Sequence, residues 1–375
     1  MEVVVTGIGL ASCLGSLQTT WSEILQGRTG IKSRKIFPEL LTYPLGLIAS
    51  EPIQINLLTH QILLDALSDS GLAIPLHECG VVIGSSRGCQ ANWEELVSQR
   101  YNSQNSEFNW LDTLPHQSAI ATARYIQTTA PVLAPTAACS TGIWALARAY
   151  ELIKTGRCKR VIAGAVEAPI TPLTLAAFEQ MGALASTGCY PFDFVREGLV
   201  LGEGGAMFVL ERKSLAFARQ AKIYGEILGF GLTCDAHHIS SPQTKNGSAA
   251  RAIKQSLRNS HLEPEDIDYV HAHGTSTVLN DLHEAQLIRH IFSQEVAVSS
   301  TKGATGHTLG GSGAINVALT LMSFKEECLL PCVGLTNSEF DLDLVTQSRK
   351  KQISNAMCLS FGFGGQNAVI TLGNS

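Results

Sequence analysis

The stretch "PTAACSTGIWALARAYELIKTG", residues 135–156, places one cysteine among small residues directly before a run that has the pattern of a helix. The free amides and the positive dipole end of a helix N-terminus favour a thiolate, which is the nucleophilic form of cysteine. The small neighbours of Cys139 also leave room for a substrate to approach closely. The segment therefore predicts a reactive thiol, although a small buried cysteine that packs under a helix has the same pattern.

Two other glycine-punctuated stretches each carry a histidine after a strand-like run. They are "HAHGTSTVLND", residues 271–281, and "STKGATGH", residues 300–307. Neutral imidazoles at His273 and His307 can donate N–H bonds to a carbonyl oxygen that becomes an enolate or an oxyanion. Together with a cysteine from a third loop, they predict a site for nucleophilic acyl transfer.

Charged residues in or next to these stretches could support the two histidines, and further histidines allow a metal site as a second interpretation. Lys302 brings a positive charge close to His307, and Glu284 could hold Lys302 or a loop in place. His271, His273 and His283 could also suggest a metal site. However, an H-x-H pair on a strand points its two rings to opposite faces, so we expect no metal here.

The composition narrows the functional class further. The chain has 375 residues, of which 45% are hydrophobic and 16% charged, and its net charge is −5. No basic run favours nucleic acid, and no apolar segment reaches the roughly 18 residues of a membrane span. The first residues do not resemble a signal peptide, so we expect a cytoplasmic protein. Its ten cysteines are scattered without a CxxC pair, which predicts reduced thiols rather than disulfides or a zinc framework.

Short β-branched runs bounded by glycine alternate with helical periods along the chain. Helices are expected at 55–72 and 248–262, and strands buried on both faces at 2–9, 79–86, 159–168, 205–211 and 267–275. This alternation is typical of a layered α/β architecture. The second half repeats the plan of the first, because a glycine-bearing strand (224–237) opens it and a loop of small residues (299–324) leads into a later helix.

Five motifs together carry a resemblance to a known family. They are "TAACSTG", "VREGLVLGEGG", "HAHGTST", "STKGATGH" and "SFGFGGQNA", in this order. The chain resembles the β-ketoacyl-acyl carrier protein synthases, which are condensing enzymes of the thiolase fold. The resemblance implies two pseudo-symmetric halves in a layered αβαβα core. We expect residues 1–220 to form the half with the cysteine and residues 221–375 the half with the two histidines.

The resemblance implies a decarboxylative Claisen condensation of an acyl thioester with a malonyl-acyl carrier protein, in fatty acid, polyketide or specialised lipid synthesis. Cys139 would take the acyl chain as a thioester. His273 and His307 would stabilise the enolate that forms when the malonyl group loses carbon dioxide. Lys302 would tune the two histidines electrostatically, with Glu284 as its partner.

The remaining implied roles concern substrate binding and partners. Thr275 and Thr277 would hydrogen-bond the phosphopantetheine arm of the carrier. The amides of Cys139 and Phe363 would form an oxyanion hole, and the Phe363 side chain would gate the acyl pocket on a loop that Gly364 makes mobile. The resemblance implies an acyl carrier protein as partner, a homodimer, and no metal or cofactor other than the substrates' phosphopantetheine.

The chain departs from the family at several positions and leaves alternatives open. Val278 replaces the usual proline, and the stretch 101–125, where the family lines its acyl pocket and dimer contact, is unfamiliar. A non-catalytic partner subunit is one alternative, although such subunits typically lack the cysteine that this chain keeps at 139. Another is a thiolase, which needs a second cysteine near the C-terminal glycine loop. A dehydrogenase would rest on "TGIGLAS", residues 6–12, alone, which is a weak motif.

Overall fold

The computed structural model describes residues 1–101, 110–243 and 247–374, so residues 102–109 of the unfamiliar stretch lie outside it. Within this part of the chain, twelve strands share one hydrogen-bonded sheet. They are β1 (Val3–Ser12), β2 (Gly15–Ser16), β5 (Cys79–Gly84), β6 (Val132–Leu133), β7 (Arg160–Glu167), β8 (Gly204–Arg212), β9 (Gly225–Cys234), β10 (Tyr269–His271), β11 (Ala297–Ser299), β13 (Asp343–Leu344), β15 (Asn355–Gly362) and β16 (Gln366–Gly373). Two small antiparallel pairs join β3 (Lys32–Arg34) to β4 (Tyr43–Leu45) and β12 (Cys328–Leu329) to β14 (Arg349–Lys350).

The strand order repeats itself in the two halves of the chain. The first half runs β1-β8-β7-β5-β6 and the second runs β9-β16-β15-β10-β11. In both, the first three strands are antiparallel neighbours and the following ones are parallel. A three-residue pairing of β1 with β9 joins the halves. This repeat is the pseudo-symmetry expected from the sequence, while the division at residue 220 stays a prediction.

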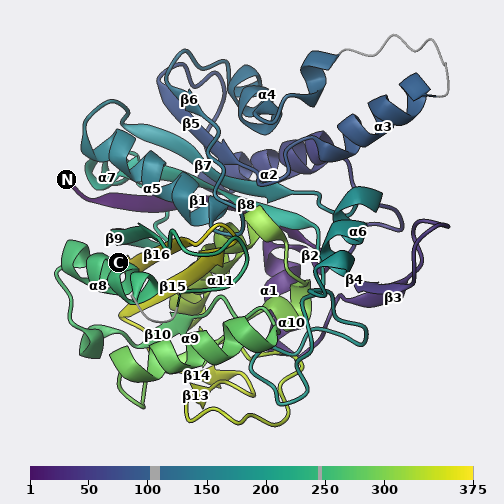
Figure 1. Cartoon of the computed structure of the whole chain (residues 1–375). Helices are drawn as coiled ribbons and strands as arrows, with labels where there is room; N and C mark the ends of the chain where they lie inside the picture. Colours follow the sequence, from purple (N-terminus) through teal and green to yellow (C-terminus); the bar gives the residue numbers. More distant parts are fainter. Residues whose placement is uncertain (102–109, 244–246, 375) are drawn as a thin grey trace.

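Helices separate and cover the two halves of the sheet (Figure 1). They are α1 (Leu17–Leu25), α2 (Ile55–Ser70), α3 (Gln90–Tyr101), α4 (Gln117–Ile126), α5 (Thr141–Lys154), α6 (Pro172–Gln180), α7 (Lys213–Ala218), α8 (Ser248–Ser260), α9 (Val278–Ile291), α10 (Lys302–Thr305) and α11 (Ser312–Glu326), with short 3-10 turns η1 (Trp110–Thr113), η2 (Pro264–Asp266) and η3 (Leu309–Gly311). The central layer contains α5 and α11, while α2 with α4 and α8 with α9 form the outer layers. The result is the expected αβαβα core.

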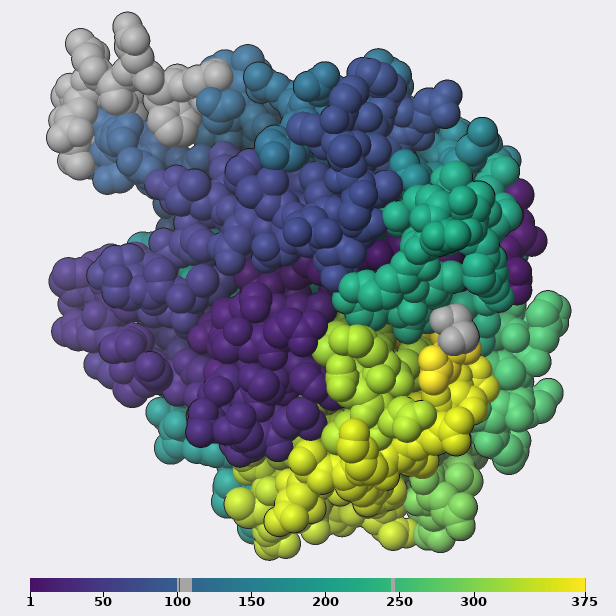
Figure 2. Space-filling model, turned by 180° about the vertical axis from the view of Figure 1, so that it is seen from behind, coloured from purple at the N-terminus to yellow at the C-terminus, as the bar shows by residue number. Residues whose placement is uncertain are grey.

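Close approach of backbones explains why small residues stand where these layers meet. A Cβ atom on Gly142 of α5 would lie 2.5 Å from the amide nitrogen of Ala314 in α11. A Cβ atom on Gly9 would lie 2.0 Å from the carbonyl oxygen of Ile62 in α2. The glycines of "TGIGLAS" therefore serve packing within a continuous strand, β1, rather than a dinucleotide-binding turn. Seen from behind, purple N-terminal residues at the surface lie between the blue part of the first half and the yellow-green C-terminal part (Figure 2).

The expected strands are present, but β10 is shorter than its pattern suggests. The sequence predicts extended structure over 267–275, whereas β10 ends at His271. Beyond it, the amides of His273, Gly274 and Thr275 donate to buried carboxylates instead of to a neighbouring strand. All ten cysteines are free thiols, and no helix of the described residues is long and apolar enough to cross a membrane.

Candidate active site

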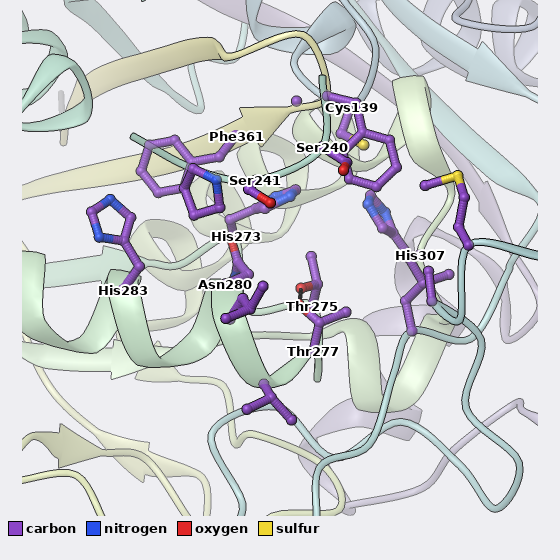
Figure 3. A pocket seen from close by; sticks show the side chains of 18 of the residues that line it. Cys139, Ser240, Ser241, His273, Thr275, Thr277, Asn280, His283, His307 and Phe361 are labelled. Carbon is purple, nitrogen blue, oxygen red and sulfur yellow. Dashed lines mark hydrogen bonds between the residues drawn. The ribbon is translucent and has the colours of Figure 1, made fainter. Parts of the chain in front are cut away.

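Cys139 lies in the loop between β6 and α5, two residues before the helix begins. Ala138 directly before it has a φ of 48°, in the left-handed region that residues with a side chain seldom adopt. The hydroxyl of Thr141 donates to the Ala138 carbonyl (2.7 Å) and accepts the Ala137 amide (2.9 Å), which stabilises this turn. The sharp turn presents the thiol of Cys139 to the cavity (Figure 3).

The second half of the chain holds the cysteine loop in place. The Ser140 hydroxyl donates to the carbonyl oxygens of Ser360 (2.9 Å) and Gln366 (2.7 Å) on β15 and β16. In return, the Ser360 hydroxyl donates to the Cys139 carbonyl oxygen at 3.0 Å. All of these groups are buried or partly buried, so the position of the thiol is fixed relative to the β15–β16 turn.

The three predicted catalytic side chains meet in space. The Cys139 sulfur and one ring nitrogen each of His273 and His307 all lie within 4.8 Å of one another, and all three residues are buried. The two imidazole rings pack edge to face with their centroids 5.3 Å apart, and the His273 ring also contacts Phe361. Figure 3 shows the histidines below the thiol, on the wall of a common cavity. The structure thus brings Cys139 together with two histidines that lie 134 and 168 positions further along the sequence.

Two buried charged side chains hold the backbone of His273, one at its amide and the other at its carbonyl oxygen. The Glu284 carboxylate accepts the amides of His273 (2.6 Å) and Gly274 (2.7 Å). The Lys302 ammonium donates to the His273 carbonyl oxygen. No ion pair within 4.0 Å joins Lys302 to Glu284, so the two predicted partners act on the same peptide rather than directly on each other.

Burial dominates the electrostatics of the thiol. It raises the pKa of Cys139 to about 11, although the Lys302 charge and the Phe363 amide both favour the thiolate. The expectation that the start of α5 would hold Cys139 as a thiolate is therefore wrong. The reason is desolvation, because a thiolate in a dry cavity loses more hydration than these donors replace.

Burial lowers the pKa values of the basic groups in the site and raises that of the carboxyl group. Burial and the nearby Lys302 charge lower the pKa values of His273 and His307 well below the usual range, so both imidazoles are neutral at pH 7. Burial also lowers the pKa of Lys302 and raises that of Glu284 to about 7. The site therefore offers neutral imidazoles beside a thiol, as the sequence predicts.

A cavity of about 520 Å³ leads from the surface to the thiol. Thr275 and Thr277 line it, and their hydroxyl groups lie 2.9 Å apart. Phe363 also lines it, in the turn between β15 and β16, where its ring stacks on Phe178 with centroids 6.1 Å apart. Its amide favours the thiolate form of Cys139 and so lowers the pKa of that thiol. The roles of the threonines in arm binding and of Phe363 as a gate stay predictions.

Gly364 requires a correction, because it is not one of the residues that line the cavity. Its φ of 77° turns its amide toward the carbonyl oxygen of Ile239, to which it donates at 2.7 Å. Gly364 therefore shapes the turn that carries Phe363 and does not face the substrate space.

The structure also shows supporting residues that the sequence analysis did not select. The Asp281 carboxylate is fully buried and accepts the amides of Thr275, Ser276 and Phe192. The Glu167 carboxylate accepts the Gly310 amide in the turn that follows His307. Asp281 could have been found, since it closes the "HGTSTVLND" stretch in the first turn of α9. Glu167 ends an apolar strand, and nothing in its sequence context marks it.

The three clustered side chains are also of a type that binds metal ions. The thiol of Cys139 and the two imidazoles are atoms that a soft or borderline divalent ion could bind, and their separations leave room for such an ion. His271 does not belong to this set, because its ring nitrogens lie 3.1 Å from the Thr320 hydroxyl and 3.2 Å from that of Thr301. The same three groups are equally suited to acyl transfer, with a sulfur nucleophile beside two hydrogen-bond donors.

Comparison with known proteins identifies the family. Residues 53–216 match the model of the beta-ketoacyl synthase N-terminal domain, and residues 224–336 match that of the C-terminal domain. The chain belongs to the β-ketoacyl synthase family. A 3-oxoacyl-[acyl-carrier-protein] synthase 2 from Synechocystis is 35% identical, over 98% of this chain and 97% of the relative. A relative of the same name from Staphylococcus aureus (strain MRSA252) is 32% identical, over 99% and 97%.

Solved structures of this family have the same fold. A type II polyketide ketosynthase in complex with its acyl carrier protein and bound to the hexaketide (AntDE:AntF) superposes with a TM-score of 0.92 at 27% identity, covering 100% of this chain and 99% of that one. A β-ketoacyl synthase from Burkholderia phymatum has a TM-score of 0.90 at 26% identity, with the same coverage. The thiolase-like architecture predicted from the motifs is therefore confirmed.

Proposed function

We propose that this chain is a β-ketoacyl-acyl carrier protein synthase that condenses an acyl thioester with a malonyl thioester and releases carbon dioxide. The observation that carries the proposal is the cluster of Cys139, His273 and His307 at the inner end of the cavity. Relatives at 32–35% identity over nearly the full chain are named 3-oxoacyl-[acyl-carrier-protein] synthases. The thiol of Cys139 and the imidazoles of His273 and His307 are of a type and spacing that suit the family's chemistry.

The first half-reaction transfers the acyl group to the enzyme. The Cys139 sulfur attacks the carbonyl carbon of an acyl-phosphopantetheine thioester, and the pantetheine thiol leaves with the proton. The Phe363 amide, which already points at the sulfur, would stabilise the oxyanion together with the Cys139 amide. Thr275 and Thr277 would hold the arm by hydrogen bonds along the cavity.

The second half-reaction forms the carbon–carbon bond. The malonyl carboxylate leaves as carbon dioxide, and its bonding electrons form an enolate on the thioester oxygen. His273 and His307 would donate hydrogen bonds to that oxygen, which they can do because burial keeps them neutral. The enolate carbon then attacks the acyl carbonyl, and the Cys139 thiolate leaves. Because decarboxylation supplies the carbanion, the electron balance requires no metal or redox cofactor.

Lys302 and Glu284 are positioning residues in this scheme. Both contact the backbone of His273 rather than the cavity, so they would fix the ring and set its electrostatic environment. Their opposite charges, buried on either side of one peptide, hold that peptide without placing a charge in the substrate space.

We propose an acyl carrier protein as the partner and a homodimer as the assembly. A structural neighbour at 27% identity is a ketosynthase in complex with its acyl carrier protein. Another neighbour is a ketosynthase in complex with its chain length factor, which supports a heterodimer as the alternative. A non-catalytic role for this chain itself is disfavoured, because Cys139 and both histidines are retained and assembled.

A condensation assay tests the proposed function. The purified chain is incubated with an acyl-acyl carrier protein and a malonyl-acyl carrier protein, and the products are identified by mass spectrometry. We expect a 3-oxoacyl carrier that is two carbons longer than the primer, with one carbon dioxide released for each condensation. Turnover that remains at the uncatalysed level across primers of two to sixteen carbons contradicts the proposal.

A further inference from the structure

The cluster of Cys139, His273 and His307 has the donor atoms and nearly the spacing of a three-ligand zinc site. All three side chains line the cavity, and their donor atoms lie within 4.8 Å of one another (Figure 3). A tetrahedral zinc ion, bound to sulfur at about 2.3 Å and to nitrogen at about 2.0–2.1 Å, holds such atoms about 3.3–3.6 Å apart. Small rotations about the side-chain torsions are enough to close this difference.

Both imidazoles can offer a lone pair to an ion at pH 7. Burial and the Lys302 charge lower the pKa values of His273 and His307 well below the usual range, so protons do not compete for these nitrogens. In the described part of the chain, the Nδ1 atom of each ring is buried and has no hydrogen-bond partner. No contact at Nδ1 therefore fixes which ring nitrogen carries the hydrogen and which one is free to coordinate.

The buried charges around the cluster leave room for one more positive charge. The Lys302 ammonium donates to the His273 carbonyl oxygen, while the Glu284 carboxylate accepts the amide of the same residue. Opposite charges so close together largely cancel at a distance. The Glu167 carboxylate adds a negative charge that is felt at the Cys139 sulfur, where it raises the pKa. Because coordination also releases the thiol proton, a divalent ion adds one net charge rather than two.

The cavity gives a cation a path to these ligands. Among the described residues that line it there is no lysine or arginine, whereas the acidic residues Glu197 and Asp235 are present. Both carboxylates already accept hydrogen bonds from the chain, so they can attract a cation without competing strongly as ligands. At the inner end the ligands are sulfur and nitrogen, which favour zinc over magnesium or calcium.

We propose that Cys139, His273 and His307 bind one zinc ion, and that zinc is a reversible inhibitor of this site; the inhibition, but not the binding, rests on the proposed function. The thiol releases its proton to solvent, and the sulfur and two imidazole nitrogens each donate a lone pair to the ion. A water molecule from the cavity is the fourth ligand, and no group is oxidised or reduced. Zinc is not a cofactor here, because the proposed condensation needs all three side chains free.

Cobalt(II), which binds in the place of zinc and is coloured, tests the binding directly. The purified chain is freed of metal with EDTA, desalted and titrated with cobalt chloride. We expect the visible bands of tetrahedral cobalt and a near-ultraviolet band from thiolate coordination, both saturating at one cobalt per chain. One equivalent of zinc chloride should remove them, because zinc binds nitrogen and sulfur ligands more tightly than cobalt does.

Variants identify the ligands. Cys139→Ala should lose the thiolate band, and His307→Ala should bind cobalt at least ten-fold more weakly, with circular dichroism to show that each variant is folded. Cys234→Ala is the matched control, since Cys234 is the exposed thiol of the chain, and it should keep the wild-type spectrum. Wild-type protein loaded with a hexanoyl group gives a test without any substitution, because a thioester sulfur cannot bind as a thiolate, and it should lack the band.

Acyl loading tests the inhibition. With hexanoyl-acyl carrier protein as donor, a small molar excess of zinc chloride should slow loading of the wild type at least ten-fold. EDTA should restore the rate to within two-fold, and magnesium chloride at the same concentration should have no effect, since magnesium prefers oxygen ligands.

Three results would overturn the inference while leaving the proposed function intact. They are a wild-type chain without the cobalt bands, bands that persist in Cys139→Ala or disappear in Cys234→Ala, and acyl loading that zinc does not slow. If the chain loads no acyl group even without zinc, the proposed function fails, and the cobalt spectra still decide whether the three residues bind the ion.

Discussion

Cys139 combines a position suited to nucleophilic attack with surroundings that keep its thiol protonated at pH 7. Burial raises its pKa to about 11, and the Glu167 carboxylate acts in the same direction. Lys302, Arg87 and the Phe363 amide oppose this shift but do not overcome it. Neutral imidazoles nearby cannot add positive charge. In the acyl transfer that we propose, alignment of the thiol with the carbonyl carbon and the oxyanion donors would have to compensate for this small thiolate fraction.

The pH dependence of alkylation tests this electrostatic account. A group with a raised pKa stays neutral until the pH approaches that value, so the thiolate fraction of Cys139 grows about ten-fold per pH unit below it. We expect the rate at which iodoacetamide modifies Cys139, followed by peptide mass spectrometry, to keep rising between pH 7 and pH 9.5. A plateau by pH 8 would instead indicate a thiol whose pKa is lowered by the start of α5.

The two histidines should matter more for decarboxylation than for loading. His273→Ala and His307→Ala each remove one donor to the enolate oxygen, and loss of such a donor typically costs on the order of 10²- to 10³-fold in rate. We expect carbon dioxide release from malonyl-acyl carrier protein to fall by that factor and acyl loading to fall far less. His290→Ala, on the exposed side of α9, is the control. Loss of loading with decarboxylation unchanged would reverse the assigned roles.

The β15–β16 turn links the gate to the nucleophile at the scale of the structural element. Its Phe363 ring stacks on Phe178, while its amide reaches the Cys139 sulfur. The left-handed residues Gly364 and Gly365 allow the chain to turn there, with φ angles of 77° and 74°. One segment thus carries both the ring of the proposed gate and the amide that favours the thiolate of Cys139.

Phe363→Ala separates these two functions, because it removes the ring and keeps the amide. Without the stack on Phe178, the acyl side of the cavity should discriminate less between chains. We expect the ratio of loading rates for short and long acyl carriers to change by about ten-fold, and turnover to fall because the turn closes less well. Single-turnover loading with two- and twelve-carbon primers measures this. Unchanged selectivity at full activity would rule out a gate.

Gly364→Ala serves as the comparison for backbone strain. A Cβ atom at this position meets nothing within 4 Å, so any loss comes from the positive φ alone. We expect the free energy of unfolding to fall by about 1–3 kcal/mol, the usual cost of such a conformation, with chain-length selectivity retained. A change of selectivity equal to that of Phe363→Ala would show that the two variants act through the same loosened turn.

The sequence predicts the elements well, and it singles out the three side chains that cluster in the candidate site, because each leaves a local signal. Buried strands such as β5 and β8 appear as apolar runs bounded by glycine, and Cys139, His273 and His307 stand in recognisable motifs. Contacts across the chain leave no such signal. The hydrogen bonds from Ser140 to β15 and β16 depend on how the two halves pack. The placement of Lys302 and Glu284 around one peptide depends on how distant segments of the second half fold together.

At the scale of the whole molecule, the first half ends in an exposed strand. β6 is the last strand of the order β1-β8-β7-β5-β6, and its Leu133 is 40% exposed. Elsewhere in the first half, α3 and η1 expose further apolar side chains, among them Trp93, Val97 and Trp110. An edge strand with an exposed leucine is a surface that proteins normally cover, and a second copy of the chain is the partner we propose.

Sedimentation velocity at micromolar concentration tests this assembly. We expect a dimer of the 375-residue chain, and Leu133→Lys should shift the equilibrium toward monomer because it places a charge on the edge strand. Leu57→Lys, an exposed leucine on α2, is the control and should remain dimeric. A wild-type chain that sediments only as monomer would contradict the proposed homodimer.

The identity of the nucleophile is the central claim, and intact-mass spectrometry of acyl-loaded protein tests it most directly. The wild-type chain, incubated with hexanoyl-acyl carrier protein, should gain the mass of one hexanoyl group as a thioester on Cys139. Cys139→Ala should gain none while keeping the circular dichroism and melting temperature of the wild type, because only a sulfur is lost from a site lined by small residues. A Cys139→Ala protein that still carries the hexanoyl group would contradict the account.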